Sequence, residues 1–236
     1  MSTSGNSTEP SPAQWRSIVT RSLATLLVLV LLLFVPAGSI TWTRGWLFLL
    51  VVVILLGAAA IYLWRINPEI FAARRRIHPG TKRWDRILLA FLLPAMVAIV
   101  PVAALDDGRF QWSRMSWWFV GFGYFLLATA VTITAWAQGV NRFFEPGVRI
   151  QTERGHHVVD TGPYAIIRHP GYFAACLLFS GMALALGSWW ALIPAVFAAL
   201  LIVIRTEWED RMLHAKLDGY AAYAKRVRFR LIPGVW

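Results

Sequence analysis

The chain has 236 residues, of which 58% are hydrophobic and only 15% are charged. A soluble domain of this length carries more charge on its surface, so the composition excludes a soluble globular protein and indicates an integral membrane protein. Cations in the loops of one membrane face, next to anionic lipid headgroups, explain the formal net charge of +11. We find no recognition module for nucleic acid and expect no nucleic-acid partner.

Residues 1–14 are rich in Ser, Thr, Pro and Gly and lack an apolar pattern, which predicts a disordered N-terminal tail. The next unit, 15–140, carries stretches that approach the length of about 20 residues needed to cross a hydrocarbon core. These predicted transmembrane helices are 22–35, extended to 41 by small residues, then 45–64, 87–105 and 117–137.

The last apolar stretch, 173–204, is too long for one helix and is interrupted by Gly187 and Ser188. It predicts a helical hairpin, and because each arm is short, the pair either spans at a tilt or dips into the bilayer. The predicted fold class is all-α: a polytopic membrane protein with five to six transmembrane helices. Residues 141–236 form the second predicted unit, a catalytic core with a loop, the hairpin and a C-terminal cytoplasmic helix.

The cations lie mostly on one predicted side of the membrane. With the N-terminus inside and six crossings, only Arg44, Arg109 and Arg114 of the 23 lysines and arginines fall outside. Because cytoplasmic loops carry the excess of Lys and Arg, we expect both termini and the loop 141–172 at the cytoplasmic face. The expected localisation is a multi-pass membrane protein, in the cell membrane if the source is bacterial.

The loop 141–172 is the longest polar segment and contains His156, Tyr164, Arg168 and His169 beside glycines and prolines. Loops of this length are commonly functional. Pro170 is favoured in the first turn of a helix, so we expect a helix to begin there. Its free backbone N–H groups, next to Arg168 and His169, would suit an anionic group such as a carboxylate.

Metal and nucleotide signatures are weak in this sequence. His156 and His157 are adjacent, and no histidine pair lies four residues apart, so the spacing matches none of the usual zinc patterns and we expect no metal. The segment 121–123 resembles a dinucleotide fingerprint but lacks its third glycine and a preceding strand. A cofactor would therefore be held by helix ends and loops.

After Ile204 the chain changes from apolar to highly charged. If the hairpin helix continues, Arg205 and Glu209 lie four residues apart on one face. One interpretation is an exposed ion pair worth a few tenths of a kcal/mol. The other is functional, because ionisable groups at this depth next to the loop 141–172 are candidates for a site.

Several motifs succeed one another between 141 and 233. They are Gly162-Pro163-Tyr164, Arg168-His169-Pro170-Gly171-Tyr172, Arg205…Glu209-Asp210…Leu213 and Tyr220…Tyr223…Arg226-Val227…Pro233. In this order they resemble the isoprenylcysteine carboxyl methyltransferase family and, more broadly, the phospholipid methyltransferase group.

The resemblance implies methyl transfer from S-adenosylmethionine at the cytoplasmic membrane face. It implies Arg205 as the substrate-binding residue, and Arg205 and Glu209 as catalytic residues. The positions that match cofactor-binding residues are Gln151, His156, His157, Val158, Val159, Tyr164, His169, Pro170, Gly171, Tyr172 and Glu209. Val158 replaces the usual Leu, and Asp210 replaces a second Glu, which implies an altered substrate contact.

The expected function is therefore methylation of a lipidic or lipid-modified acceptor with a carboxylate, with membrane lipids as further partners. Alternatives are a phospholipid or lipid amine N-methyltransferase, an NADPH-dependent membrane reductase, and a non-enzymatic membrane scaffold or transport component. Cations of the loop 72–86 could serve a dinucleotide phosphate, but we interpret them as topological. Neither the identity of the acceptor nor the oligomeric state follows from the sequence.

Overall fold

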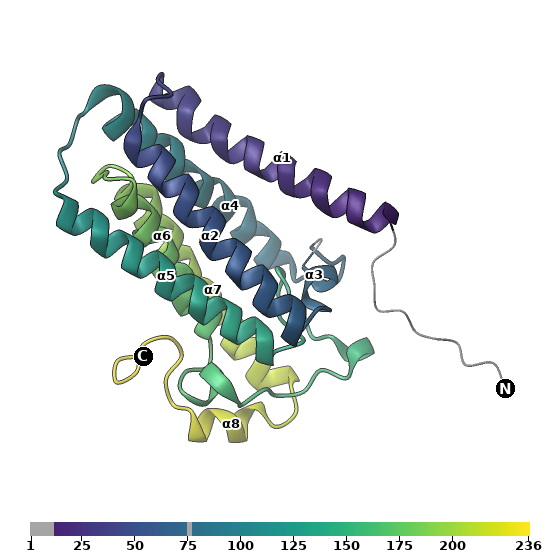
Figure 1. The fold of residues 1–236 in the computed structure, drawn as a ribbon. Helices are drawn as coiled ribbons and strands as arrows, with labels where there is room; N and C mark the ends of the chain where they lie inside the picture. The colour runs from purple at the N-terminus through teal and green to yellow at the C-terminus, as the bar shows by residue number, and fades with distance from the viewer. Residues whose placement is uncertain (1–11, 75–76) are drawn as a thin grey trace.

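The computed structural model describes residues 12–74 and 77–236, and these contain helices and no strand. The helices are α1 (Pro12–Ala37), α2 (Thr43–Ile66), α3 (Ile70–Ala73), α4 (Arg83–Ala103), the π-helical turn η1 (Ala104–Phe110), α5 (Trp117–Val140), the 3₁₀ turns η2 (Thr152–Arg154) and η3 (Gly162–Ala165), α6 (Pro170–Ala185), α7 (Leu192–Lys216) and α8 (Tyr220–Arg226). The predicted all-α class is confirmed (Figure 1).

Among the described residues, three helical segments are long and apolar enough to cross a membrane: Thr43–Ile66, Arg83–Phe110 and Trp117–Val140. Shorter apolar helices occupy Ser22–Ala37 and Pro170–Ala185. This is the pattern of a polytopic membrane protein, while the predicted number of five to six spans stays a prediction. Helix α1 begins at Pro12, so the last three residues of the predicted tail 1–14 are helical, and 1–11 lie outside the described residues.

The predicted hairpin is present, and its turn contains the expected glycine. Helix α6 ends at Ala185 and α7 begins at Leu192. Gly187 has a φ of +79°, which L-residues with a side chain rarely adopt. Ser188 is buried and fixes the turn, because its Oγ donates to Asp106 Oδ2 at 2.6 Å and accepts from the backbone N–H of Ala191 at 3.0 Å.

Glycines bring α5 and α6 into backbone contact. A Cβ added at Gly123 would collide with the backbone nitrogen of Ala185, and one at Gly181 would lie 3.0 Å from the carbonyl oxygen of Gly123. Small residues allow such close helix packing in membranes. Gly123 therefore serves the packing of α5 against α6. These two helices fix both ends of the segment 141–169.

The turn η1 fastens the end of the bundle that carries few cations. Asp106, fully buried, accepts the backbone N–H and the hydroxyl of Ser113 at 2.7 and 2.5 Å. Asp107 accepts Trp42 Nε1–H at 2.7 Å and pairs with Arg44. Buried carboxylates require such partners, and these contacts join the ends of α2, η1 and the segment before α5.

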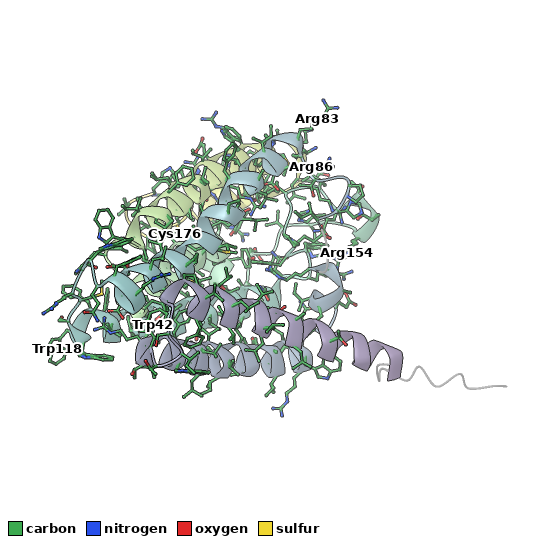
Figure 2. The ribbon with its side chains drawn as sticks, turned by 90° about the horizontal axis from the view of Figure 1, so that it is seen from above. Trp42, Arg83, Arg86, Trp118, Arg154 and Cys176 are labelled. Carbon is green, nitrogen blue, oxygen red and sulfur yellow. The ribbon has the colours of Figure 1, made fainter. Side chains whose placement is uncertain are left out.

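The segments with the predicted site residues lie at the opposite end of the bundle. Figure 1 shows α3, the loop after α5, and α8 together at the end where α2 and α5 finish. In Figure 2, Arg83, Arg86 and Arg154 lie toward that end, while Trp42 and Trp118 lie toward the other. This shared placement agrees with the predicted gathering of loop cations on one face.

The orientation of this end predicts a labelling result. We expect a cysteine placed at the exposed Thr152 to react with a membrane-impermeant maleimide only after bacterial cells expressing the protein are opened, because the cation-rich loops are expected inside. A cysteine in place of Trp118, which is 89% exposed at the other end, should react in intact cells. Both variants carry Cys176→Ala, which removes the single cysteine. The reverse pattern would overturn the orientation.

Candidate active site

Helix α6 begins at Pro170, as predicted from the sequence. Pro170 occupies the first turn, and the backbone N–H groups of Tyr172 and Phe173 donate to the carbonyl oxygen of His169 at 3.0 and 3.1 Å. His169 is the residue that caps the helix, with a φ of −125°. The start of α6 therefore fixes the imidazole of His169 and the phenol ring of Tyr172, which stack with a centroid distance of 5.6 Å and an interplanar angle of 3°.

Arg168 does not offer its guanidinium to a bound anion, as the sequence suggested, because other residues of the chain engage it. Its Nε and NH2 groups donate to the two carboxylate oxygens of Asp210 at 2.8 and 3.0 Å. Its NH1 group donates to the carbonyl oxygens of Val227 and Arg228 at 2.9 and 2.8 Å. Four of the five N–H groups of this guanidinium are thus engaged, so Arg168 ties the C-terminal segment to the loop before α6.

Asp210 is the centre of this arrangement. It is fully buried, and besides Arg168 it accepts Tyr220 O–H at 2.8 Å and Arg230 Nε–H at 2.9 Å, while His169 Nε2 lies 3.2 Å from it. Burial opposes its charge, but the hydrogen bonds from His169, Arg168 and Arg230 outweigh burial and lower the pKa of this carboxyl. We term Arg168, Asp210, Tyr220 and Arg230 the anchor cluster.

The altered substrate contact expected from Asp210 is therefore not supported by its position. Asp210 does not line the neighbouring cavity, and its oxygens face side chains of the anchor cluster. Two backbone hydrogen bonds, from Arg168 N–H to Phe229 O at 3.0 Å and from His169 N–H to Arg230 O at 2.9 Å, strengthen the same connection. Asp210 thus contacts His169 from outside the cavity and helps to hold its imidazole in place.

This cavity, of about 390 Å³, opens among the loop 141–172 and helices α4, α6 and α7. Most of the residues predicted to hold a cofactor or an acceptor line it. These are Gln151, His156, His157, Val158, Val159, Tyr164, His169, Gly171, Tyr172, Arg205 and Glu209. Pro170 is the exception, since it is buried at the start of α6 and does not line the cavity. Residues separated by more than fifty positions thus share one space.

The polar end of the cavity contains the carboxylate of Glu209, which has few partners among the described residues. Glu209 accepts a hydrogen bond from Tyr172 O–H, and no ion pair joins it to a cation within the described part of the chain. Tyr164 accepts from Asn141 Nδ2 at 2.9 Å, which places its ring on the same wall. At Gly171 an added Cβ would lie 2.7 Å from the ring of Phe144, so only glycine lets this ring pack against the start of α6.

The histidine pair and Gln151 form the loop side of the cavity. Both ends of the buried Gln151 amide are engaged, since Nε2 donates to Phe143 O at 2.7 Å and Oε1 accepts from Arg154 at 2.9 Å. His156 Nδ1 accepts the backbone N–H of Gln151 at 3.3 Å. Burial, followed by the charges of His157 and Arg149, lowers the pKa of His156 to about 4. The ring is therefore neutral at pH 7, with its proton on Nε2.

Arg205 and Glu209 do not form the exposed ion pair that the non-functional interpretation required. Arg205 is 6% exposed, and its Nε and NH2 groups donate to the two oxygens of Asp85 at 2.7 and 3.1 Å. NH2 also donates to Pro146 O at 2.6 Å, and the guanidinium lies 5.1 Å from the ring centre of Tyr172. Arg205 thus reaches the cavity as a buried, oriented cation.

Asp85 was missed by sequence reasoning. It is fully buried in the first turn of α4 and also accepts the backbone N–H of Val148 at 2.7 Å. In the sequence it is an acid near a helix N-terminus, where the helix dipole alone would explain it. A partner 120 positions away leaves no local signal.

The other end of the cavity is apolar. Its wall comes from α4, α6 and α7, and it consists of Leu89, Leu92, Leu93, Met96, Ala175, Leu178, Phe179 and Ile202. These side chains could not be separated from lipid-facing ones by hydropathy. The combination of a polar end and an apolar end fits an amphiphilic ligand, since ligand sites are mostly apolar with a few oriented polar groups.

Comparison with known proteins identifies the segment that carries this site. Residues 117–218 match the model of the phospholipid methyltransferase family. No curated protein matches the chain. The matched segment runs from α5 to the end of α7 and crosses the predicted boundary at 140, which itself stays a prediction. Residues 117–218, which contain most of the candidate site, are therefore similar to the phospholipid methyltransferase family, the family that includes the isoprenylcysteine carboxyl methyltransferases.

Proposed function

We propose that the protein transfers a methyl group from S-adenosylmethionine to the carboxylate of a lipidic or lipid-modified acceptor at the cytoplasmic face of the membrane. The family implies a membrane methyltransferase that acts on lipid-type substrates. The observation that carries the finer proposal is the cavity, in which predicted cofactor residues meet an apolar wall and the oriented guanidinium of Arg205.

The polar end of the cavity suits the proposed cofactor. Glu209 retains acceptor capacity for an ammonium group, and the neutral His156 presents an Nε2–H donor. The aromatic rings of Tyr164 and Tyr172 suit a cation as well, because ring faces attract positive charge. When bound, S-adenosylmethionine supplies an electrophilic methyl carbon on a positively charged sulfur.

The residues of the chain then have to orient the acceptor and exclude water. A carboxylate is already a nucleophile at neutral pH, so no general base is required. Arg205 retains its NH1 group for the acceptor, since Nε and NH2 are engaged by Asp85 and Pro146. The leucines of α4 surround the hydrocarbon part, and holding two reactants in line can supply about 7–11 kcal/mol of the barrier reduction.

A second candidate function is N-methylation of a phospholipid amine. It is favoured by the family match and by Glu209, whose carboxylate lies in the cavity with one hydrogen bond from Tyr172. An amine must lose a proton before it attacks, and Glu209 or His169 would serve as the base. The identity of the acceptor thus decides whether Glu209 has a catalytic role in addition to cofactor binding.

Calorimetry with the purified protein tests the proposed cofactor. We expect S-adenosylmethionine to bind, and His169→Ala and Glu209→Gln each to weaken binding by about 1–3 kcal/mol, the range for a lost buried polar partner. Arg211→Gln is the matched control, because the Arg211 side chain is 73% exposed on the same helix and does not line the cavity. Binding of NADPH but not S-adenosylmethionine would refute the proposal. Unchanged affinity in both cavity variants would remove these residues from the cofactor site.

A further inference from the structure

One cation of the cavity lies before residues 117–218, the segment that matches the family, and has been given no role so far. Arg74 comes directly after the short helix α3 and lines the cavity. Its guanidinium lies 5.2 Å from the ring centre of Phe144, the residue that packs against Gly171. The sequence assigned this arginine, with its neighbours, to membrane topology. Its position in the cavity wall requires a more specific explanation.

Arg74 differs from the other arginines of the cavity in its partners. Arg149 pairs with Glu145 at 2.7 Å, Arg168 with Asp210 at 2.8 Å, and Arg205 with Asp85 at 2.7 Å. Within residues 12–74 and 77–236, no carboxylate forms an ion pair with Arg74. Arg74 is therefore the cavity-lining arginine that forms no ion pair within those residues.

Arg74 lies close enough to Arg205 for the two positive charges to repel each other. Partial desolvation is the larger cause of the lowered pKa of Arg74, and the positive charge of Arg205 is the second. Two like charges that share one cavity raise the energy of the empty site. An anionic group placed near both would reverse that repulsion, and the guanidinium geometry matches carboxylate and phosphate oxygens.

We propose that Arg74 binds the anionic group of the methyl acceptor, so that Arg74 and Arg205 together select acceptors with a carboxylate or phosphate next to a long hydrocarbon chain. This inference rests on the proposed function and names the recognition element of the same site. The apolar wall of α4, with Leu89, Leu92 and Leu93, lies on the side from which the hydrocarbon would enter.

A carboxylate acceptor and a phosphate-bearing acceptor differ in the charge of their methylated products. The methyl ester of a carboxylate has no charge, so the arginine pair would hold the product less tightly than the acceptor. A phospholipid keeps its phosphate after its amine is methylated, and the arginine pair would hold product and acceptor alike. The two sources of the anion are therefore distinguishable by comparing charged and neutral ligands of equal chain length.

Binding measured without turnover tests the proposal. In a nonionic detergent, N-acetyl-S-farnesyl-cysteine is compared with its methyl ester, and lysophosphatidic acid with the monoacylglycerol of the same chain. We expect wild type to bind the anionic member of at least one pair tenfold or more tightly than the neutral member. Arg74→Gln should reduce that preference to threefold or less, and Arg74→Lys should restore it only in part.

Arg83→Gln is the matched control, because Arg83 is exposed at the same end of the molecule and does not line the cavity (Figure 2). It should keep the wild-type preference. Equal binding of both members in both pairs, or an unchanged preference in Arg74→Gln, would overturn the proposal. Failure of the proposed function gives a different result, namely no binding of S-adenosylmethionine by wild type while the preference for anions persists. The pair that shows the preference identifies the anion.

Discussion

Replacing Asp210 with alanine is expected to lower the free energy of unfolding by about 3–5 kcal/mol, the cost of breaking a buried ion pair from one side. Asp210 is fully buried, and the variant leaves the guanidinium of Arg168 without its carboxylate. His169 loses its partner at the same time, so the affinity for S-adenosylmethionine should fall as well. Denaturant unfolding in detergent and calorimetry measure the two effects.

The control for this variant is Arg211→Ala. Arg211 pairs with Glu207 on the same helix, but its side chain is 73% exposed, and such pairs contribute at most about 0.5 kcal/mol. Because the pKa of Asp210 is lowered in the folded state, its contribution is complete above the unfolded value of about 4 and decreases as the pH falls below it. A loss of stability in Asp210→Ala no larger than in Arg211→Ala would contradict the anchor role.

Arg205→Ala is expected to combine a loss of stability with a loss of methyl transfer. Asp85 would remain buried without its cation, which costs about 3–5 kcal/mol, and the acceptor would lose its orienting group, which costs turnover about 100-fold or more. Arg205→Lys should not restore full activity, because an ammonium cannot reproduce the two-pronged contact with Asp85. Turnover is measured with whichever acceptor the protein methylates.

A double variant separates the two effects. Asp85→Ala combined with Arg205→Ala removes both charges, so part of the lost stability should return, since residues in direct contact are not additive. Methyl transfer should stay low. If turnover returned together with stability, Arg205 would have a structural role only. Wild-type turnover in Arg205→Ala would exclude it from the active site altogether.

The sequence predicted what depends on local chemistry. Hydropathy located the helices, Pro170 marked the start of α6, and Gly187 marked the turn of the hairpin. The helices follow from runs of apolar residues, the start of α6 from the missing N–H of Pro170, and the turn from the positive φ of Gly187. Each of these causes lies in one residue or one short stretch. The order of the motifs between 141 and 233 also indicated which residues would meet in one cavity.

The pairing of buried charges did not follow from the sequence. Asp85 and Arg205 lie 120 positions apart, and Arg168 and Asp210 lie 42 apart. In a chain whose loops are rich in cations, an arginine that serves topology and one that contacts a carboxylate look the same. Only the packing of α4 against α7 distinguishes them, and that packing is a property of the whole bundle.

The two ends of the cavity come from different stretches of the chain, which bears on how such an enzyme acquires a new substrate. The residues predicted to hold S-adenosylmethionine all lie within 117–218, whereas the leucine wall of α4 and Arg74 lie before it. Substitutions at Arg74 and at the leucines of α4 are therefore expected to change the size and charge accepted by the cavity, as long as Asp85, which holds Arg205 and Val148, is kept. Acceptor preference is open to engineering at those positions.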